Sequence, residues 1–297
     1  KASAMALGNC DLLIVLGSRF SDRVLCNAGT FAKNTKIIHI EIDPAEIGKN
    51  ISVDAYVAGD LKYVLAKLNE ILPDMKHSEW MSEIADWKNK YALKMIPIES
   101  EDEVLPQDVI EELDRLTNGE AIITTEVGQH QMWAAQYYNF RKPRSFASSG
   151  GLGTMGYGLG AAIGSKCGNP DRPVINIAGD GSFFMNCNEL SSLAKHNIPV
   201  IELVFENNVL GMVRQWQRLF YGKRFSQTDI DRGTDLIKLA DAFGIESFAI
   251  KPMLEKALSC GRPCLIDCRI NKDVNVLPMV PAGADVLEPI MEIDLSE

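Results

Sequence analysis

The sequence predicts an α/β protein whose main part is a doubly wound parallel sheet of six strands, preceded by part of a second α/β domain. Short apolar segments alternate with amphipathic ones along the chain, which is the pattern of buried parallel strands covered by helices on both faces. Six apolar segments between residues 121 and 270 carry this pattern. Glycine-rich turns follow two of them, at the strand ends where open parallel sheets bind ligands.

The composition of the chain disfavours some classes of function and favours others. The chain has 297 residues, 24% of them charged, and a net charge of −10, so binding to nucleic acid or to an anionic membrane surface is disfavoured. No apolar run reaches the roughly 20 residues of a membrane helix. Seven cysteines, an odd number, indicate reduced thiols and a cytoplasmic location. Cys260, Cys264 and Cys268 are interpreted as buried small hydrophobes rather than as a metal site, because no histidine lies near them.

The chain divides into three regions. Residues 1–74 contain two strand-like segments, 11–17 and 36–43, and one helix for which Asp60 is the expected N-cap. Two strands and one helix are too few for a stable sheet domain, so we expect this region to be the carboxyl-terminal part of a longer domain. Residues 75–104 are polar and helical and are expected to be a linker. Residues 105–297 form the second domain, whose expected strands are 121–128, 145–149, 173–180, 199–207, 246–251 and 263–270.

The strongest motif joins two neighbouring strand ends. Gly179-Asp180-Gly181 ends one strand, and Asn207-Asn208 ends the next. One βαβ unit separates them, so Asp180 and Asn208 are expected to be neighbours at one edge of the sheet. Carboxylate and amide oxygens are the ligands that Mg²⁺ prefers, with phosphates at its other positions. An isolated Gly-Asp-Gly would favour a simple turn, and Asn-Asn a helix cap, but the pairing of the two favours a metal site.

This pairing resembles the cofactor motif of the thiamine-diphosphate enzymes, and three further segments resemble acetolactate synthases within that superfamily. They are EVGQH (126–130), GGLGTMGYGLGAAIG (150–164) and the closing LPMVPAGAD (277–285). Read without the resemblance, the glycine-rich segment is a tight strand-to-helix turn. The resemblance implies that Asp180, Asn208 and the Leu210 carbonyl hold Mg²⁺. It further implies cofactor contacts at Gly128, Gln129, His130, Gly179, Gly181, Ser182, Gly211 and Met212, with Gly153 receiving the cofactor's amino group and Met155 enforcing its bent shape.

The segment NNVLGMVRQWQRLFYG (207–222) separates members of the superfamily. Its apolar residues Met212, Val213, Trp216 and Phe220 also fit a helix with an ordinary core stripe, and both interpretations stand at this point. GMVRQWQ followed by Phe-Tyr resembles acetolactate synthases rather than related decarboxylases or oxidases. By that resemblance Trp216 lines the substrate channel and favours a larger second 2-oxoacid.

The amino-terminal region resembles the FAD segment of acetolactate synthases in GSRFSDRV (17–24) and HIEID (39–43). A basic loop paired with local acids explains the first of these equally well. The resemblance implies flavin contacts at Gly17, Arg19, Asp22, Arg23 and Val24, with Glu41, Ile42 and Asp60 nearer the adenosine end. Ser21 and Glu41 stand where the family usually has Asp.

The resemblance implies an enzyme of branched-chain amino acid biosynthesis that decarboxylates pyruvate and joins the two-carbon unit to pyruvate or 2-oxobutyrate. Thiamine diphosphate, Mg²⁺ and a structural FAD are the expected cofactors. The expected assembly is a homodimer or tetramer, with a possible small regulatory subunit. The alternatives are another thiamine-diphosphate decarboxylase or oxidase, and a cofactor-binding module without activity. Residues 1–297 alone are expected to be inactive, because the family's catalytic Glu belongs to a separate amino-terminal domain.

Overall fold

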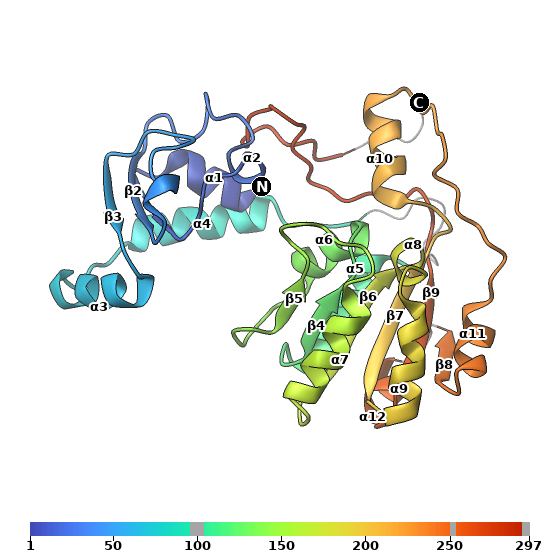
Figure 1. Cartoon of the computed structure of the whole chain (residues 1–297). Coiled ribbons are helices and arrows are strands. Elements are labelled where there is room, and N and C mark those ends of the chain that lie inside the picture. Colours follow the sequence, from blue (N-terminus) through green and yellow to red (C-terminus); the bar gives the residue numbers. More distant parts are fainter. Residues whose placement is uncertain (96–103, 250–253, 293–297) are drawn as a thin grey trace. The chain divides into compact units, whose positions relative to one another are not determined.

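The computed structural model describes residues 1–95, 104–249 and 254–292 (Figure 1). It contains two compact units, Lys1–Leu93 with Leu277–Glu297, and Lys94–Val276. These units differ in extent from the expected domains, because a helix inside the expected linker and the carboxyl-terminal tail both group with the amino-terminal residues. Residues 96–103 of that linker and residues 250–251 of the expected strand 246–251 lie outside the described residues.

The first unit is built on a three-stranded parallel sheet in the order β1-β2-β3. Its strands are β1 Leu12–Leu16, β2 Lys36–Glu41 and β3 Ala55–Ala58, and its helices are α1 Ala2–Asn9, α2 Asp22–Leu25, η1 Pro44–Glu46, α3 Leu61–Ile71 and α4 Ser78–Lys90. The two expected strands are confirmed, whereas β3 was not expected. Only four residues long, β3 carries little periodicity, and its pairing with β2 defines it.

Local sequence signals account for the helices of this unit. The Asp60 carboxylate caps α3, because it accepts hydrogen bonds from the backbone N–H groups of Lys62 (2.9 Å) and Tyr63 (3.3 Å). The N-cap expected at this position is therefore confirmed. Helix α4, which lies within the expected linker, packs against α1 and groups with the first unit.

The second unit contains a six-stranded parallel sheet in the order β5-β4-β6-β7-β9-β8, as the sequence predicts. Its strands are β4 Ile122–Thr125, β5 Phe146–Ser148, β6 Val174–Gly179, β7 Val200–Glu206, β8 Glu246–Ala249 and β9 Cys264–Arg269. Its helices are α5 Pro106–Thr117, α6 Gln129–Tyr137, α7 Gly158–Gly168, α8 Asp180–Phe183, η2 Cys187–Glu189, α9 Leu190–His196, α10 Gly211–Phe220, α11 Leu236–Ala242 and α12 Leu254–Ser259.

The central strands of this sheet are fully covered. All but the last residue of β6 and of β7 are buried, as near-continuous apolar strands of a parallel sheet require. On one face, alternate residues of β6 and β7 pack with Leu159 of α7, Leu193 of α9 and Leu236 of α11. Helix α6 packs against β4 and β6, and its Trp133 contacts Phe205 of β7 edge-on with ring centroids 5.8 Å apart.

A row of buried polar side chains crosses the centre of the sheet. The parallel register aligns Thr124 with Asn176 and Asn176 with Glu202, so the three side chains share a face. Thr124 Oγ1 donates to Asn176 Oδ1 (2.8 Å), and Asn176 Nδ2 donates to the Glu202 carboxyl at 2.9 Å. Each partner satisfies the next, as a buried polar network requires.

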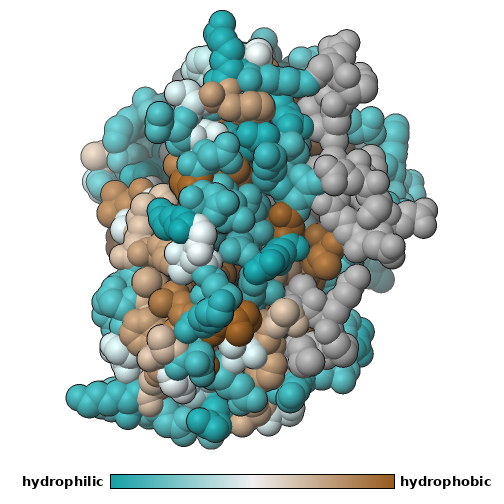
Figure 2. All heavy atoms as spheres, turned by 90° about the vertical axis from the view of Figure 1, so that its right-hand side faces the viewer, coloured by the Kyte–Doolittle hydropathy of each residue, from teal (hydrophilic) through white to brown (hydrophobic). Residues whose placement is uncertain are grey.

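The molecular surface is mixed in character. On the face shown in Figure 2, hydrophobic residues form small groups separated by hydrophilic ones. Within the described ranges, no helix has the length and apolar character needed to cross a membrane.

We predict that Glu202→Gln removes a pH-dependent part of the free energy of unfolding. Burial raises the pKa of Glu202 well above 4.5, so as the pH rises the unfolded chain releases this proton before the folded chain does. The stability due to that proton is complete below about pH 4.5 and is lost as the pH rises toward the folded-state pKa. Urea unfolding across this range should show wild type losing stability relative to the variant.

Glu246→Gln, which changes an exposed carboxyl on β8, is the matched control and should follow wild type. A stability difference between Glu202→Gln and wild type that stays constant with pH would contradict the prediction.

Candidate functional site

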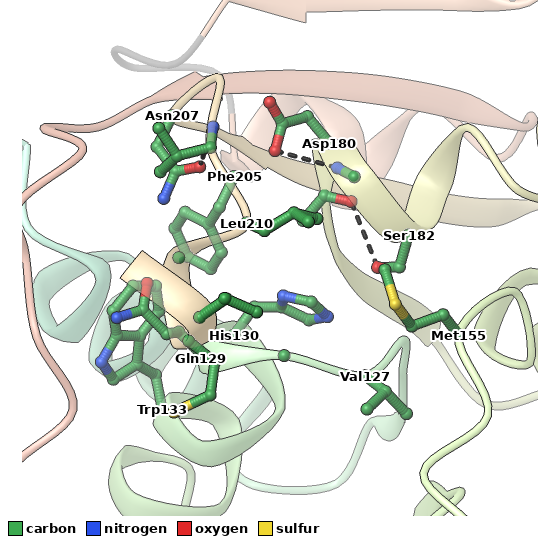
Figure 3. A pocket seen from close by; sticks show the side chains of 17 residues that line it. Val127, Gln129, His130, Trp133, Met155, Asp180, Ser182, Phe205, Asn207 and Leu210 are labelled. Atoms are coloured by element: carbon green, nitrogen blue, oxygen red, sulfur yellow. Dashed lines mark hydrogen bonds between the residues drawn. The ribbon is translucent and has the colours of Figure 1, made fainter. Parts of the chain in front are cut away.

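A pocket lies at the carboxyl ends of β4, β6 and β7. Three segments line most of it: residues 127–130 at the start of α6, residues 179–182 at the start of α8, and residues 209–213 at the start of α10. In Figure 3, Asp180 and Ser182 lie on one side of the pocket and Gln129 and Trp133 on the opposite side, with the His130 ring between them. Three helix starts therefore surround one cavity, and backbone N–H groups at helix starts favour an anionic ligand.

Asp180 is the carboxylate of this pocket. Its Oδ1 accepts from the Gly181 N–H (2.9 Å), and its Oδ2 accepts from the Asn208 N–H (2.8 Å). The expected proximity of Asp180 and Asn208 is thereby confirmed, and it follows from the pairing of β6 with β7. Burial raises the pKa of Asp180 to about 6, although these two hydrogen bonds act in the opposite direction. A cation beside the carboxylate would favour its charged form.

Of the two asparagines after β7, only Asn207 lines the main pocket, and both line a neighbouring depression. Asn207 lines the pocket, and its Oδ1 accepts from the Val209 N–H (3.2 Å). Asn208 has a positive φ of 59°, and it lines a neighbouring depression between residues 206–208 and 231–235. Leu210 lines the pocket and is the N-cap of α10. Of the three expected metal ligands, Asp180 and Leu210 therefore share the pocket, and Asn208 reaches Asp180 through its main chain.

His130 is a buried side chain with unused hydrogen-bonding capacity. Burial lowers its pKa to about 3, so the ring is neutral at physiological pH. Its Nε2 has no hydrogen-bond partner among the described residues, and neither has the buried Nε1 of Trp133 on the same helix. A Cβ at Gly179 would lie 2.7 Å from the His130 ring, so glycine permits this close approach. Gln129 Oε1 is a third atom at this pocket without a partner among the described residues; unpaired buried polar atoms are rare, so the three together favour this pocket as the candidate ligand site.

The glycine-rich segment before α7 forms another wall. Met155 lines the pocket, and Gly153 adjoins it, since a Cβ there would lie 3.8 Å from the pocket residue Val127. The buried Glu126 carboxylate anchors the segment by accepting from the backbone N–H groups of Gly156 (2.6 Å) and Leu159 (3.1 Å). This role of Glu126 could not be predicted from the sequence, because nothing in EVGQH reveals which backbone groups its side chain meets.

Helix α10 is polar on its buried side and apolar on its open side. Its buried residues are Arg214 and Gln215, whereas Val213 and Phe220 are 47% and 40% exposed. The core-stripe interpretation is therefore wrong for this helix. Trp216 contacts Phe220 with ring centroids 5.1 Å apart and lines a shallow depression with Val213, Gln217, Tyr221 and Arg224. Val213 lines both this depression and the main pocket, so the two adjoin.

The residues expected to contact a flavin gather in the first unit. Gly17 follows β1, Glu41 ends β2, and Asp60 follows β3, so all three lie at the carboxyl edge of that sheet. Glu41 is buried and accepts from the Ile42 N–H (2.8 Å). Arg19, Asp22, Arg23, Val24 and Ile42 are exposed. Neither arginine takes part in a salt bridge within the described part of the chain.

The pocket brings together most of the residues expected in the second unit. Those that line it are Gly128, Gln129, His130, Met155, Gly179, Asp180, Gly181, Ser182, Leu210, Gly211 and Met212. Its apolar lining by Trp133, Phe205 and Val209 was missed. In sequence these three residues are indistinguishable from ordinary core, and only their position beside strand ends could have suggested them.

Two family models match the chain. Residues 126–268 match the thiamine pyrophosphate enzyme C-terminal TPP binding domain, and residues 1–68 match the thiamine pyrophosphate enzyme central domain. The first match contains the pocket segments, and the second contains the three-stranded sheet. The chain therefore belongs to the thiamine pyrophosphate enzymes.

Three relatives of this chain within that class are named as acetolactate synthases. The chain is 44% identical to a probable acetolactate synthase large subunit of Methanococcus aeolicus, over 98% of this chain and 53% of the relative. It is 41% identical to acetolactate synthase 2, chloroplastic, of Nicotiana tabacum (97% and 46%). It is 40% identical to the mitochondrial acetolactate synthase catalytic subunit of Saccharomyces cerevisiae (96% and 44%). The chain is thus homologous to acetolactate synthases and spans about half the length of these curated relatives.

Proposed function

We propose that this chain supplies the diphosphate-binding half of an acetolactate synthase. The observation that carries the proposal is the pocket itself, in which Asp180, His130 and Leu210 meet at adjoining strand ends. Similarity to acetolactate synthases over 98% of the chain supports the particular reaction. The enzyme would decarboxylate pyruvate and join the two-carbon unit to pyruvate or 2-oxobutyrate, in branched-chain amino acid biosynthesis in the cytoplasm.

The pocket suits a thiamine diphosphate held through Mg²⁺. Asp180, the Asn208 side chain and the Leu210 carbonyl would hold the cation, and all three are hard oxygen donors of the kind that Mg²⁺ prefers. No group of three or more His, Cys, Asp or Glu side chains able to hold a metal occurs in the described ranges, which accords with a cation whose other ligands are phosphate oxygens. The starts of α6 and α8 offer backbone N–H groups to those phosphates. When bound, the cofactor supplies an electron sink for decarboxylation.

The remaining pocket residues would orient the cofactor and exclude water. Met155 projects from the segment that Glu126 anchors, which fixes where its side chain can press against a bound ring. Trp133 and Phe205 provide an apolar wall, and a dry wall strengthens the electrostatic interactions inside the pocket. His130, neutral and buried, would face the diphosphate with its unpaired nitrogen. Trp216 would contact the second substrate from the adjoining depression.

A structural FAD is proposed for the first unit. The exposed Arg19 and Arg23 would meet its diphosphate, and the carboxyl edge of the sheet is the usual ligand-binding edge of a parallel α/β fold. The Asp60 and Glu41 carboxylates bind backbone N–H groups, so their part here is to shape the loops around that edge. The working enzyme would be a homodimer or tetramer, with a small regulatory subunit as a further partner.

We predict that Asp180→Ala abolishes the Mg²⁺ dependence of thiamine diphosphate binding and most of the affinity. Loss of a ligand should cost more than the roughly 10–100-fold that outer-shell changes cost in metal sites. Calorimetric titration of residues 1–297 with the cofactor, with and without Mg²⁺, measures both quantities. Asp171→Ala, at an exposed position before β6, is the control. Unchanged metal-dependent binding in Asp180→Ala would remove Asp180 from the ligand set.

The second prediction concerns the choice of acceptor. In a longer polypeptide that contains this chain and has activity, Trp216→Leu should lower the preference for 2-oxobutyrate over pyruvate by about 1–3 kcal/mol while carboligation persists, because a pocket contact contributes discrimination of that size. The product ratio with both acceptors present is the measurement, and Trp87→Leu on α4 is the control. An unaltered ratio would show that Trp216 does not contact the acceptor.

The third prediction is that residues 1–297 by themselves form no acetolactate. Carboligation in this family is proposed to need a Glu from a separate amino-terminal domain, and the relatives are about twice as long as this chain. The purified polypeptide would be incubated with pyruvate, thiamine diphosphate, Mg²⁺ and FAD, beside a full-length acetolactate synthase. Turnover comparable to that enzyme would mean that the catalytic carboxylate lies within residues 1–297.

A further inference from the structure

The buried side of α10 carries an amide that pairs with main chain. Gln215 is 2% exposed. Its Nε2 donates to the Val276 carbonyl (2.9 Å), and its Oε1 accepts from the Val276 N–H (2.9 Å). The side chain therefore imitates a backbone strand partner for the last residue of the second unit. Both main-chain groups would be buried without this partner, and such groups are costly to leave unpaired.

A second glutamine joins this pair from α6. Gln129 Nε2 donates to Gln215 Oε1 (2.9 Å) and to the Val274 carbonyl (3.0 Å). A carbonyl can only accept, so Val274 fixes which end of the Gln129 amide faces it. Both hydrogen atoms of the amide nitrogen are thus used within the protein. The resemblance assigns Gln129 to the diphosphate, but its side-chain donor is already committed to α10 and to residues 274–276.

The same two glutamines set how closely α10 approaches α6. A Cβ at Gly211 would lie 2.1 Å from Gln129 Oε1, so the first residue of α10 presses directly against the Gln129 amide and has to be glycine. Both helices begin at the pocket, where Gln129 and His130 line one wall and Leu210 to Val213 line another. The separation of these walls therefore depends on the contact between Gln129, Gly211 and Gln215.

An ion-pair cluster at Asp273 supports the same contact. Arg214 Nε lies 2.8 Å from Asp273 Oδ1, and Arg218 lies 2.5 Å from the same oxygen. The Arg214 guanidinium also stacks over the Phe225 ring at 3.9 Å. Helix α10 is thus tied to residues 273–276 at two places, by charges at Asp273 and by the amide at Val276.

We propose that Gln215 and Gln129 form an amide latch, defined as their hydrogen bonds to each other and to Val274 and Val276, that positions α10 against the cofactor pocket. Gln215 is a positioning residue in this role, because it acts on the pocket through Gln129 and Gly211. The latch rests on the proposed function only for its effect on cofactor affinity. The placement of α10 that it sets exists without any ligand.

The first experiment measures hydrogen exchange in residues 1–297 without ligand. Gln215→Leu should accelerate exchange at Val276 and in the first turn of α10 by roughly tenfold or more, since a buried hydrogen bond there is lost. Gln217→Leu is the matched control. Gln217 lies one residue beyond Trp216 and makes the same two-way amide pairing, but with Ser226 in a surface loop. The Gln217→Leu variant should accelerate hydrogen exchange only around residue 226.

The second experiment measures thiamine diphosphate affinity in the presence of Mg²⁺, using Gln215→Glu beside Gln215→Leu. A carboxylate at position 215 cannot donate to the Val276 carbonyl, whereas a protonated carboxyl can. The ratio of the Kd of Gln215→Glu to that of wild type should be roughly 10 at about pH 8. It should approach one at about pH 5.5, because burial raises the pKa of the introduced carboxyl and the carboxyl is then protonated. Charged and titratable groups near position 215 include Arg214 and Arg218 on its own helix, the Asp273 carboxylate that pairs with both, and His130, which follows Gln129 on α6. Wild type carries them too, so the ratio removes their titration.

The outcomes separate cleanly. Faster exchange at Val276 in Gln215→Leu, weaker cofactor binding, and recovery of Gln215→Glu at low pH support the latch. A Kd ratio independent of pH, or faster exchange with unchanged affinity, would overturn the positioning role, and so would exchange identical to wild type. If Gln215→Leu does not fold, the pH series on Gln215→Glu decides. If wild type binds no cofactor, the proposed function fails, and the ligand-free exchange of Gln215→Glu at the two pH values still decides whether the latch holds α10.

Discussion

The parallel pairing of β6 with β7 is the constraint on which the rest of the site depends. It places Asp180 and Asn208 at the same edge of the sheet, and the hydrogen bond from the Asn208 N–H to the Asp180 carboxylate records their proximity. Because both strands are buried along nearly their whole length, their register cannot slip without moving apolar side chains out of the core. The stability of the sheet thus fixes the position of the one carboxylate in the pocket.

Buried polar groups in this unit differ in whether the fold satisfies them, and among the described residues unpaired atoms occur at the pocket and also at Asp114 and Asp267, outside it. At the centre of the sheet, Thr124, Asn176 and Glu202 satisfy one another. At the pocket, His130 Nε2 and Trp133 Nε1 have no partner among the described residues. Folding tolerates unpaired buried groups only at a cost in free energy, and a bound ligand removes that cost. A bound ligand would satisfy the unpaired atoms that line the pocket, which supports the pocket as the candidate site.

Helix α10 also buries polar side chains that have specific partners. An amphipathic helix normally buries its apolar side, yet α10 buries Arg214 and Gln215 and leaves Val213 and Phe220 open. The buried polar residues have specific partners in residues 273–276. Hydrogen bonds and ion pairs are directional, so they fix the orientation of the helix more tightly than apolar contact would. The apolar side then remains available beside the pocket.

Local patterns in the sequence predicted the six-stranded sheet, the helix that begins after Asp60 and most of the residues that line the pocket. Strand identity follows from local apolar runs, and the Gly-Asp-Gly and Asn-Asn turns follow from residues that must stand at strand ends. The tertiary structure alone decided which side of α10 is buried, because an apolar stripe has the same periodicity whether it faces core or cavity. It also decided that β3 is a strand and that Gln129 bonds to Gln215, which is 86 residues away along the chain. The common reason is that periodicity and turn chemistry are local properties, whereas the partner of a buried polar side chain is chosen by the packing of segments that the sequence does not place side by side.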